Sequence, residues 1–227
     1  MTITHLSQLD PNGIYTYADY LLWQLKERVE LLSGRIFSMS PAPSRRHQEV
    51  IGDLHWRLVN FFKQCTDKCD CKVYLAPFDV RLSQKESTDN QIYTVVQPDL
   101  CIICDPNKLD DRGAIGAPDL VIEVLSAHNS KKDLKDKYKI YEEAGIPEYW
   151  IVYPQEQSIS VYTLEQGHYI GLPPVAQGEP VRSVRFPDMN IIMNFEFWVF
   201  NFELLQLKTK HSKLKTFICF FLGSLRC

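Results

Sequence analysis

The sequence predicts one α/β domain: a mixed β-sheet flanked by helices, with a hairpin before the sheet and a β-meander after it. Three observations support this prediction. Apolar residues recur at helical spacing over residues 44–64, which predicts a long amphipathic helix. Runs rich in Val and Ile and bounded by Pro or Gly indicate buried strands at 95–103 and 118–125. A second helix at 130–144 is followed by another apolar strand at 148–153.

The elements before the first long helix are expected to be short. Thr16 can cap a helix that ends near residue 25. The dipeptide Ser33-Gly34 separates two strand-like segments, 30–32 and 35–37, and it suits a tight hairpin turn.

The first long helix has one apolar face. His47 lies one turn before Ile51 and is expected to point inward with that face, whereas Gln48 and Glu49 lie off it. The face consists of Ile51, Leu54, Leu58, Phe61 and Phe62.

A third strand is expected before the two apolar runs. Residues 72–82 alternate as a strand with one break at Pro77, and 83–91 and 105–117 are expected to be loops. The central order is therefore helix, three strands, helix, strand.

The second helix has recognisable ends. Ser130 can cap it, with Asp133 placed to complete a capping box, and Gly145 ends it. After the strand that follows, segments 158–164 and 168–172 form the predicted meander.

Composition places the chain among ordinary globular proteins. Of 227 residues, 45% are hydrophobic and 23% are charged. The net charge of −3 argues against a strongly basic nucleic-acid coat, because Lys and Arg drive phosphate binding. No secretory signal begins the chain and the apolar run 217–222 is too short to span a bilayer, so a cytoplasmic location with no membrane partner is expected. Residues 1–207 are expected to form the domain, and 208–227 a basic and apolar tail of unknown role.

The cysteine pattern does not predict a metal site. Seven cysteines, an odd number, suggest a protein with reduced thiols. Cys65, Cys69 and Cys71 lack a fourth ligand at the spacing of a zinc site. Cys101 and Cys104 have CxxC spacing, but residues three apart in a strand point to opposite faces, so both are interpreted as small core residues.

Two carboxylates inside the apolar strand runs, Asp99 and Glu123, carry the main functional hypothesis. An ionised carboxylate in a buried strand is costly unless a charge, a hydrogen-bond donor or a metal meets it. Neighbouring strands lie about 5 Å apart, so these two side chains can share one cation, whereas Asp119 is roughly 13 Å from Glu123 along the same strand. Mg²⁺ suits two carboxylates, water and a substrate phosphate, with the backbone carbonyl of Val124 as a further candidate ligand and Mn²⁺ as an alternative ion.

Lys137 is the candidate cation of this site. It lies at the edge of the apolar stripe of the second helix, formed by Leu134, Tyr138 and Tyr141. There it could orient a water nucleophile and stabilise charge that develops on a phosphate. The alternative is a surface ion pair with Asp133, four residues earlier, and the spacing leaves both interpretations open.

The other candidates also have structural alternatives. Asp99 could accept backbone hydrogen bonds after Pro98, and His47 could be a satisfied, half-buried histidine rather than a catalytic residue. Glu123 lies mid-strand between apolar neighbours, which favours a function. Glu49 could be a third metal carboxylate, but its position off the apolar face predicts exposure to solvent.

Several segments resemble the Uma2 family (the DUF820 group), a set of proteins abundant in cyanobacteria and regarded as endonucleases. The resemblance covers about residues 16–193. It rests on Met39-Ser40-Pro41 with His47, Gln97-Pro98-Asp99-Leu100, residues 116–126, Asp133, Lys137, Tyr141 and residues 145–152.

The resemblance implies a restriction-endonuclease-like fold of the PD-(D/E)xK type. It also implies Mg²⁺-dependent hydrolysis of phosphodiester bonds, with Asp99 and Glu123 as metal ligands. Where such nucleases carry the lysine of their ExK motif, this chain has Leu125. The family supplies its lysine from the following helix, which corresponds to Lys137.

These observations predict a metal-dependent endonuclease whose partner is nucleic acid, with DNA as the expected substrate. Its candidate catalytic residues are Asp99, Glu123, Lys137 and His47. The missing ExK lysine and the acidic charge support an alternative, a catalytically inactive nuclease-fold module that binds nucleic acid or a protein partner. A homodimer is also left open, including one in which the acidic pocket serves only as the interface.

Overall fold

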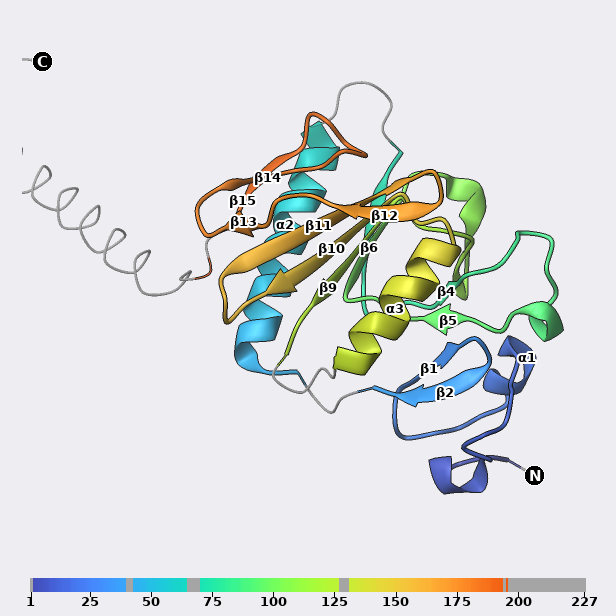
Figure 1. Ribbon diagram of the computed structural model, residues 1–227. Coiled ribbons are helices and arrows are strands. Elements are labelled where there is room, and N and C mark those ends of the chain that lie inside the picture. The colour runs from blue at the N-terminus through green and yellow to red at the C-terminus, as the bar shows by residue number, and fades with distance from the viewer. Residues whose placement is uncertain (1, 40–42, 65–69, 127–130, 194, 196–227) are drawn as a thin grey trace, which may run out of the picture. The chain divides into compact units, whose positions relative to one another are not determined.

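The computed structural model describes residues 2–39, 43–64, 70–126, 131–193 and 195 (Figure 1). The side chains of residues 131–133 are not described. The chain divides into two compact units, Met1–Met193 and Asn194–Cys227, and all elements below belong to the first. The predicted tail, 208–227, lies outside the described residues.

A seven-stranded sheet runs through the first unit (Figure 1). Its strand order is β12-β11-β10-β9-β6-β3, with β13 paired to β11. Strands β9 and β10 are parallel and the other neighbours are antiparallel, so the sheet is mixed, as predicted. The strands are β3 (Lys72–Leu75), β6 (Leu100–Ile103), β9 (Leu120–Val124), β10 (Glu148–Tyr153), β11 (Ser158–Glu165), β12 (His168–Gly171) and β13 (Val175–Ala176).

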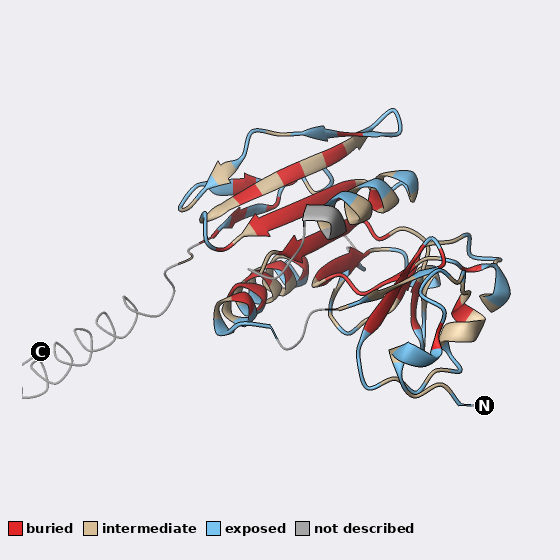
Figure 2. Cartoon of the chain, turned by 60° about the horizontal axis from the view of Figure 1, so that its bottom comes forward, coloured by how far each residue is buried: buried red, intermediate tan, exposed pale blue. Residues whose placement is uncertain are grey.

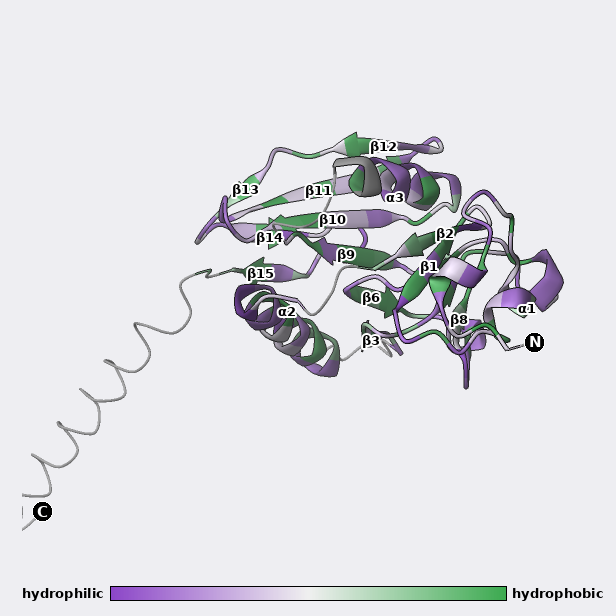
Figure 3. Cartoon of the chain, turned by 90° about the horizontal axis from the view of Figure 1, so that it is seen from below, coloured by the Kyte–Doolittle hydropathy of each residue, from purple (hydrophilic) through white to green (hydrophobic). Residues whose placement is uncertain are grey.

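Two helices, α2 (Arg45–Gln64) and α3 (Lys131–Glu143), cover opposite faces of this sheet (Figures 1 and 3). Most of the predicted apolar face of α2 is buried, with Leu54 and Leu58 fully inaccessible to solvent, whereas Phe61 is only partly buried. The hydroxyl of Ser44 accepts a 3.3 Å hydrogen bond from the N–H of His47 and so caps the helix. Along the chain these elements follow as α2, β3, β6, β9, α3 and β10, so the predicted order of helix, three strands, helix and strand is confirmed for the seven-stranded sheet and its two helices.

The end of α3 is fixed by its glycine. Gly145 has φ +75°, a conformation that residues with a side chain rarely adopt. Its N–H donates to the carbonyl of Glu142 at 3.0 Å, and the N–H of Ile146 donates to the carbonyl of Tyr141 at 3.1 Å. This Schellman motif satisfies the last carbonyls of the helix and turns the chain into β10.

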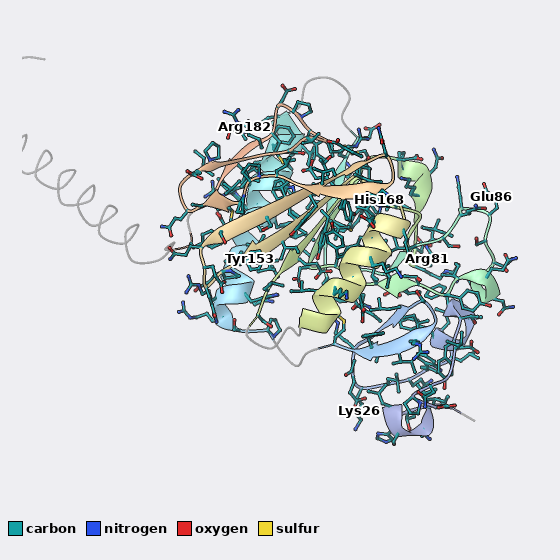
Figure 4. All side chains as sticks on the ribbon, in the orientation of Figure 1. Lys26, Arg81, Glu86, Tyr153, His168 and Arg182 are labelled. Atoms are coloured by element: carbon teal, nitrogen blue, oxygen red, sulfur yellow. A yellow bond between two sulfur atoms is a disulfide. The ribbon has the colours of Figure 1, made fainter. Side chains whose placement is uncertain are left out.

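A second, six-stranded sheet has the order β2-β1-β5-β4-β8-β7. In it the guanidinium of Arg81, labelled in Figure 4, donates to the carbonyl of Ala114 at 3.1 Å and pairs with Asp110 at 2.7 Å. A separate two-stranded ribbon joins β14 (Pro180–Arg182) to β15 (Asn190–Ile192). The strands of the six-stranded sheet are β1 (Val29–Leu32), β2 (Arg35–Ser38), β4 (Val80–Arg81), β5 (Val95–Val96), β7 (Leu109–Asp110) and β8 (Gly113–Ile115).

The predicted hairpin is confirmed as β1 and β2. Ser33 and Gly34 both have positive φ, +51° and +79°, as a two-residue hairpin turn of type I′ requires. Thr16 caps α1 as predicted, but α1 spans only Tyr17–Tyr20, because the chain leaves the helix at Leu21 instead of near residue 25.

Three element predictions are wrong in their extent. The predicted strand 72–82 is divided between β3 and β4, which lie in different sheets and flank a cis Ala76–Pro77 bond. The run 95–103 is likewise divided between β5 and β6. The expected loop 105–117 contains β7 and β8, because Gly113 lets the backbone approach β4 closely enough for the N–H of Ala114 to donate to the carbonyl of Asp79.

The central strands carry the core. Figure 2 shows β9 and β10 almost entirely buried, and Figure 3 shows β6 as a hydrophobic strand between the two helices. On the inner face of α3, the ring of Tyr141 packs edge-to-face on Tyr149 of β10, with ring centroids 5.1 Å apart, and both belong to one buried hydrophobic cluster. None of the described helices combines the length and the hydrophobicity needed to cross a membrane.

One cysteine prediction is wrong. Cys71 and Cys104 form a disulfide, whereas Cys104 was expected to be an unbonded core residue of a reduced protein. The register explains the pair, since Lys72 is opposite Ile103 and the next pair along β3 and β6 is Cys71 and Cys104. Cys101 is buried and free, as expected. Cys65 and Cys69 lie outside the described residues.

Candidate active site

A cleft of about 470 Å³ lies between the hairpin β1–β2, the start of α2 and the ends of β6 and β9. We call it the acidic cleft. Six polar or charged side chains that line it carry the argument below: Glu30, His47, Gln97, Asp99, Glu123 and Lys137.

Asp99 and Glu123 are brought together by strand pairing. Leu100 of β6 is opposite Ile122 of β9, so the next pair along this antiparallel register is Asp99 and Glu123. The N–H of Val124 donates to Asp99 Oδ2 at 2.8 Å, which continues the pairing through a side chain. The predicted proximity of the two carboxylates is therefore present, and Glu123 is only 5% exposed.

Lys137 enters the cleft from α3. Its Nζ lies 2.9 Å from Glu123 Oε1 and 3.0 Å from Glu30 Oε1, and its side chain is 13% exposed. Lys137 is therefore not a surface residue, and the side chain of Asp133, its alternative partner, lies outside the described residues. One turn later, the hydroxyl of Tyr141 donates a 2.6 Å hydrogen bond to the same oxygen of Glu123.

The electrostatics of the cleft follow from burial and from its excess of carboxylates. Burial raises the pKa of Glu123 to about 7; the charges of Asp99 and Glu30 add to this, while Lys137 and the hydroxyl of Tyr141 oppose it. Burial alone would lower the pKa of Lys137, but the charges of Glu123 and Glu30 outweigh it and raise that pKa. Lys137 therefore remains a cation in the cleft.

His47 faces Asp99 from the first turns of α2. It is 8% exposed, and its Nε2 lies 3.3 Å from Asp99 Oδ2. Burial lowers the pKa of His47, but hydrogen bonds to Asp99 and to the backbone of Val124, with the charge of Asp99, leave it raised. Its Nδ1 is buried and has no hydrogen-bond partner among the described residues.

Two carboxylates considered from the sequence lie outside this arrangement. Asp119 pairs with Arg185 at 2.7 Å and accepts from the N–H of Cys104 at 2.8 Å, so it fixes the start of β9. Glu49 is partly exposed and pairs with Arg45, one turn earlier in α2, in agreement with its predicted position off the apolar face.

The sequence analysis missed Glu30 and the network behind it. Glu30 accepts a 2.7 Å hydrogen bond from the N–H of Gln97. The side chain of Gln97 accepts from Arg28 at 2.7 Å and donates to Asp79 at 2.7 Å. The signal for Glu30 was the one used for Asp99, a carboxylate within an apolar strand run, since it lies between Val29 and Leu31.

The oxygen atoms that could hold a divalent cation belong to Asp99 and Glu123. The contacts with Val124 and His47 fall on Oδ2 of Asp99, and those with Lys137 and Tyr141 fall on Oε1 of Glu123. They do not use Oδ1 of Asp99 or Oε2 of Glu123. Within the described part of the chain, no three His, Cys, Asp or Glu side chains are grouped so as to hold a metal ion by themselves. A cation here would need further ligands from the backbone, water or substrate.

Comparisons with known proteins agree with the fold and the motifs. The model of the Uma2 family, described as "Putative restriction endonuclease", matches residues 17–194. The crystal structure of "a putative nuclease belonging to DUF820" from Anabaena variabilis ATCC 29413 is similar, with a TM-score of 0.59 and 17% sequence identity. The similarity covers 80% of this chain and 95% of that chain, and at this identity it shows a shared fold. No curated protein matches the chain.

Proposed function

Because the chain belongs to the Uma2 family, we propose that it is a metal-dependent endonuclease that hydrolyses phosphodiester bonds, with DNA as its substrate. The observation that carries this proposal is the convergence of Asp99, Glu123 and Lys137 in one cleft. Two carboxylates beside a buried ammonium are the side chains that metal-assisted phosphodiester hydrolysis needs.

The donor set fits Mg²⁺ or Mn²⁺. Mg²⁺ is usually held by one or two carboxylates together with water and substrate phosphate, and Asp99 and Glu123 supply two carboxylates. The backbone carbonyl of Val124 is the third proposed ligand. Burial is the main cause of the raised pKa of Glu123, and the negative charges of Asp99 and Glu30, which a divalent cation would offset, add to it. When bound, the cation would supply a nucleophilic water at neutral pH and neutralise the scissile phosphate.

The chain's own groups have separate parts in this proposal. Lys137 has one N–H left beyond its contacts with Glu30 and Glu123, and it donates this one to the attacking water, while its charge stabilises the transition state. His47 holds the orientation of Asp99 through its Nε2. Leu125, which stands where an ExK lysine would be, packs against the core, and Lys137 reaches Glu123 from α3 instead.

The test is cleavage of supercoiled plasmid and of single-stranded DNA by the purified protein with Mg²⁺ or Mn²⁺. We expect Asp99→Asn to lower the cleavage rate roughly 100-fold or more. The matched control is Asp111→Asn, an exposed aspartate that does not line the cleft, and it should retain the wild-type rate. Equal rates for Asp99→Asn and wild type would reject the site.

Nucleic-acid binding and calorimetry on the same purified protein address the inactive-module alternative. In the structure, Lys137 is already engaged by two carboxylates, which is also compatible with a purely structural role. Nucleic-acid binding without cleavage, together with no heat of Mn²⁺ binding in calorimetry, would favour a binding module over the enzyme.

A further inference from the structure

Glu30 is a third carboxylate in the acidic cleft, and it comes from the hairpin instead of from the seven-stranded sheet. It is 4% exposed within β1, a strand whose residues are all buried. Its Oε1 lies 3.0 Å from Lys137 Nζ and accepts a 2.7 Å hydrogen bond from the N–H of Gln97. The two contacts on one oxygen fix the direction in which this carboxylate points.

Lys137 is therefore held by carboxylates from two sheets. Its Nζ lies within 3.0 Å of both Glu30 and Glu123. A lysine side chain has high rotamer entropy, so a single contact would leave the ammonium free to move. Two anchors from separate elements define one position for it.

Of these two carboxylates, only Glu30 is not also a metal ligand in the proposed mechanism. Glu123 is also a proposed metal ligand, and a carboxylate that shares its charge with a divalent cation attracts an ammonium less strongly. Glu30 has no such ligand role in the proposal. It is the anchor whose attraction for Lys137 does not depend on the metal.

The carboxylate of Glu30 is held by a hydrogen-bonded network that includes Gln97. The donor to Glu30, the N–H of Gln97, belongs to a residue whose side chain is fixed on two sides by Arg28 and Asp79. Strand β1 also pairs with β5 through Leu31 and Val95, two residues before Gln97. The hairpin, Gln97 and Lys137 therefore form one connected set of contacts, with β1 lying beside α3 (Figure 1).

We propose that Glu30 is a positioning residue that holds the Lys137 ammonium in the cleft, so that the hairpin β1–β2 completes the active site. This inference rests on the proposed nuclease function for the role of Lys137. The competing explanation is that Glu30 only fastens the hairpin to α3 and has no influence on turnover.

The first test does not depend on activity. Glu30→Gln keeps the side-chain shape and removes the charge, and Glu27→Gln, an exposed neighbour, is the matched control. In metal-free full-length protein, the ammonium signal of Lys137 is observed by ¹H–¹⁵N NMR and assigned by its loss in Lys137→Arg. We expect a sharp signal in wild type and Glu27→Gln, and a broadened or missing one in Glu30→Gln. An unchanged signal in Glu30→Gln overturns the proposal.

The second test is kinetic. With Mn²⁺ and a DNA substrate, Glu30→Gln should lower kcat roughly 10- to 100-fold while KM changes less than about threefold. A lower unfolding midpoint with unchanged kcat would show a fastening role alone and overturn the proposal. If Glu30→Gln does not fold, Glu30→Asp replaces it in both tests, and a wild-type kcat and Lys137 signal in that variant also overturn the proposal. If wild type cleaves no nucleic acid, the proposed function fails, and the NMR signal alone decides the role of Glu30.

Discussion

The backbone N–H of Val124 donates a 2.8 Å hydrogen bond to the side chain of Asp99, so that a carboxylate takes the place of the next main-chain acceptor between β6 and β9. The distance between the acidic groups is therefore set by strand pairing. A site built on rigid strands keeps its geometry better than one built on loops. Substitutions that change the charges of the cleft should consequently act through electrostatics, and the fold should remain the same.

Removing Lys137 should cost much of the stability of the protein. Lys137→Met leaves Glu30 and Glu123 buried without their shared cation, and breaking a buried pair in this way costs roughly 3–5 kcal/mol in the free energy of unfolding. Urea unfolding at pH 8 measures this loss. The control is Lys135→Met on the exposed side of α3, which should stay within about 0.5 kcal/mol of wild type. Equal stabilities of the two variants would contradict the buried placement of Lys137.

Glu123 should make stability fall as pH rises in metal-free protein. Its pKa is raised from 4.5 to about 7 in the folded state, chiefly by burial, so between these values the folded state binds the proton that the unfolded state has lost. The folded state therefore loses stability across this window, and below about pH 4.5 the group has no further effect. Glu123→Gln should remove this slope. Thermal unfolding of both proteins in EDTA from pH 4 to 8 is the measurement, and an identical slope in the variant would contradict the assignment.

His47 should titrate as a partner of Asp99. Because Asp99 raises the pKa of His47 against the effect of burial, Asp99→Asn should lower that pKa. The stability that His47 contributes is complete below its unfolded pKa of about 6.5 and is lost as pH rises through the higher folded value. NMR titration of the His47 ring protons measures the shift. Asp111→Asn should leave the titration unchanged, and a His47 pKa that is the same in Asp99→Asn would contradict the contact.

Two glycines should respond to alanine in opposite directions. A Cβ at Gly113, which has φ +124°, would collide with the carbonyl oxygen of Asp79, so Gly113→Ala should cost roughly 3 kcal/mol or more of stability. Gly52 lies within α2 with no atom in reach of an added Cβ, so Gly52→Ala should stabilise by about 1 kcal/mol. Denaturant unfolding of both variants checks the pair. A tolerated Gly113→Ala would contradict the close approach of β8 to β4.

Much of the candidate site was predictable because its main residues are charged side chains within apolar segments, a pattern that is visible in the sequence. Asp99 and Glu123 stand out as charges within apolar runs, and the pairing of β6 with β9 brings them together. Lys137 was undecided because a residue at the edge of a helical stripe is buried or exposed according to how the helix is rotated on the sheet. Only the tertiary packing of α3 settles that rotation.

Other features could not be predicted because local patterns do not show which sheet a strand joins. Glu30 carries the same signal as Asp99, but the hairpin pattern gives no indication that β1 lies beside α3. The alternation of residues 72–82 and the apolar run 95–103 hide a change of sheet at Pro77 and near Pro98. The Cys71–Cys104 pair likewise depends on the β3–β6 register, which spacing along the chain does not reveal.

Residues 95–103 supply β5 to one sheet and β6 to the other, and Gln97 and Asp99 lie in the segment between these two strands. A short backbone segment that lines the cleft therefore connects the two sheets. Opening the angle between the two sheets would move Glu30 of β1 away from Lys137, whereas Asp99 and Glu123 would stay together because both belong to the seven-stranded sheet. A change in that angle would therefore alter how the Lys137 ammonium is anchored and leave the spacing of the two strand carboxylates as it is.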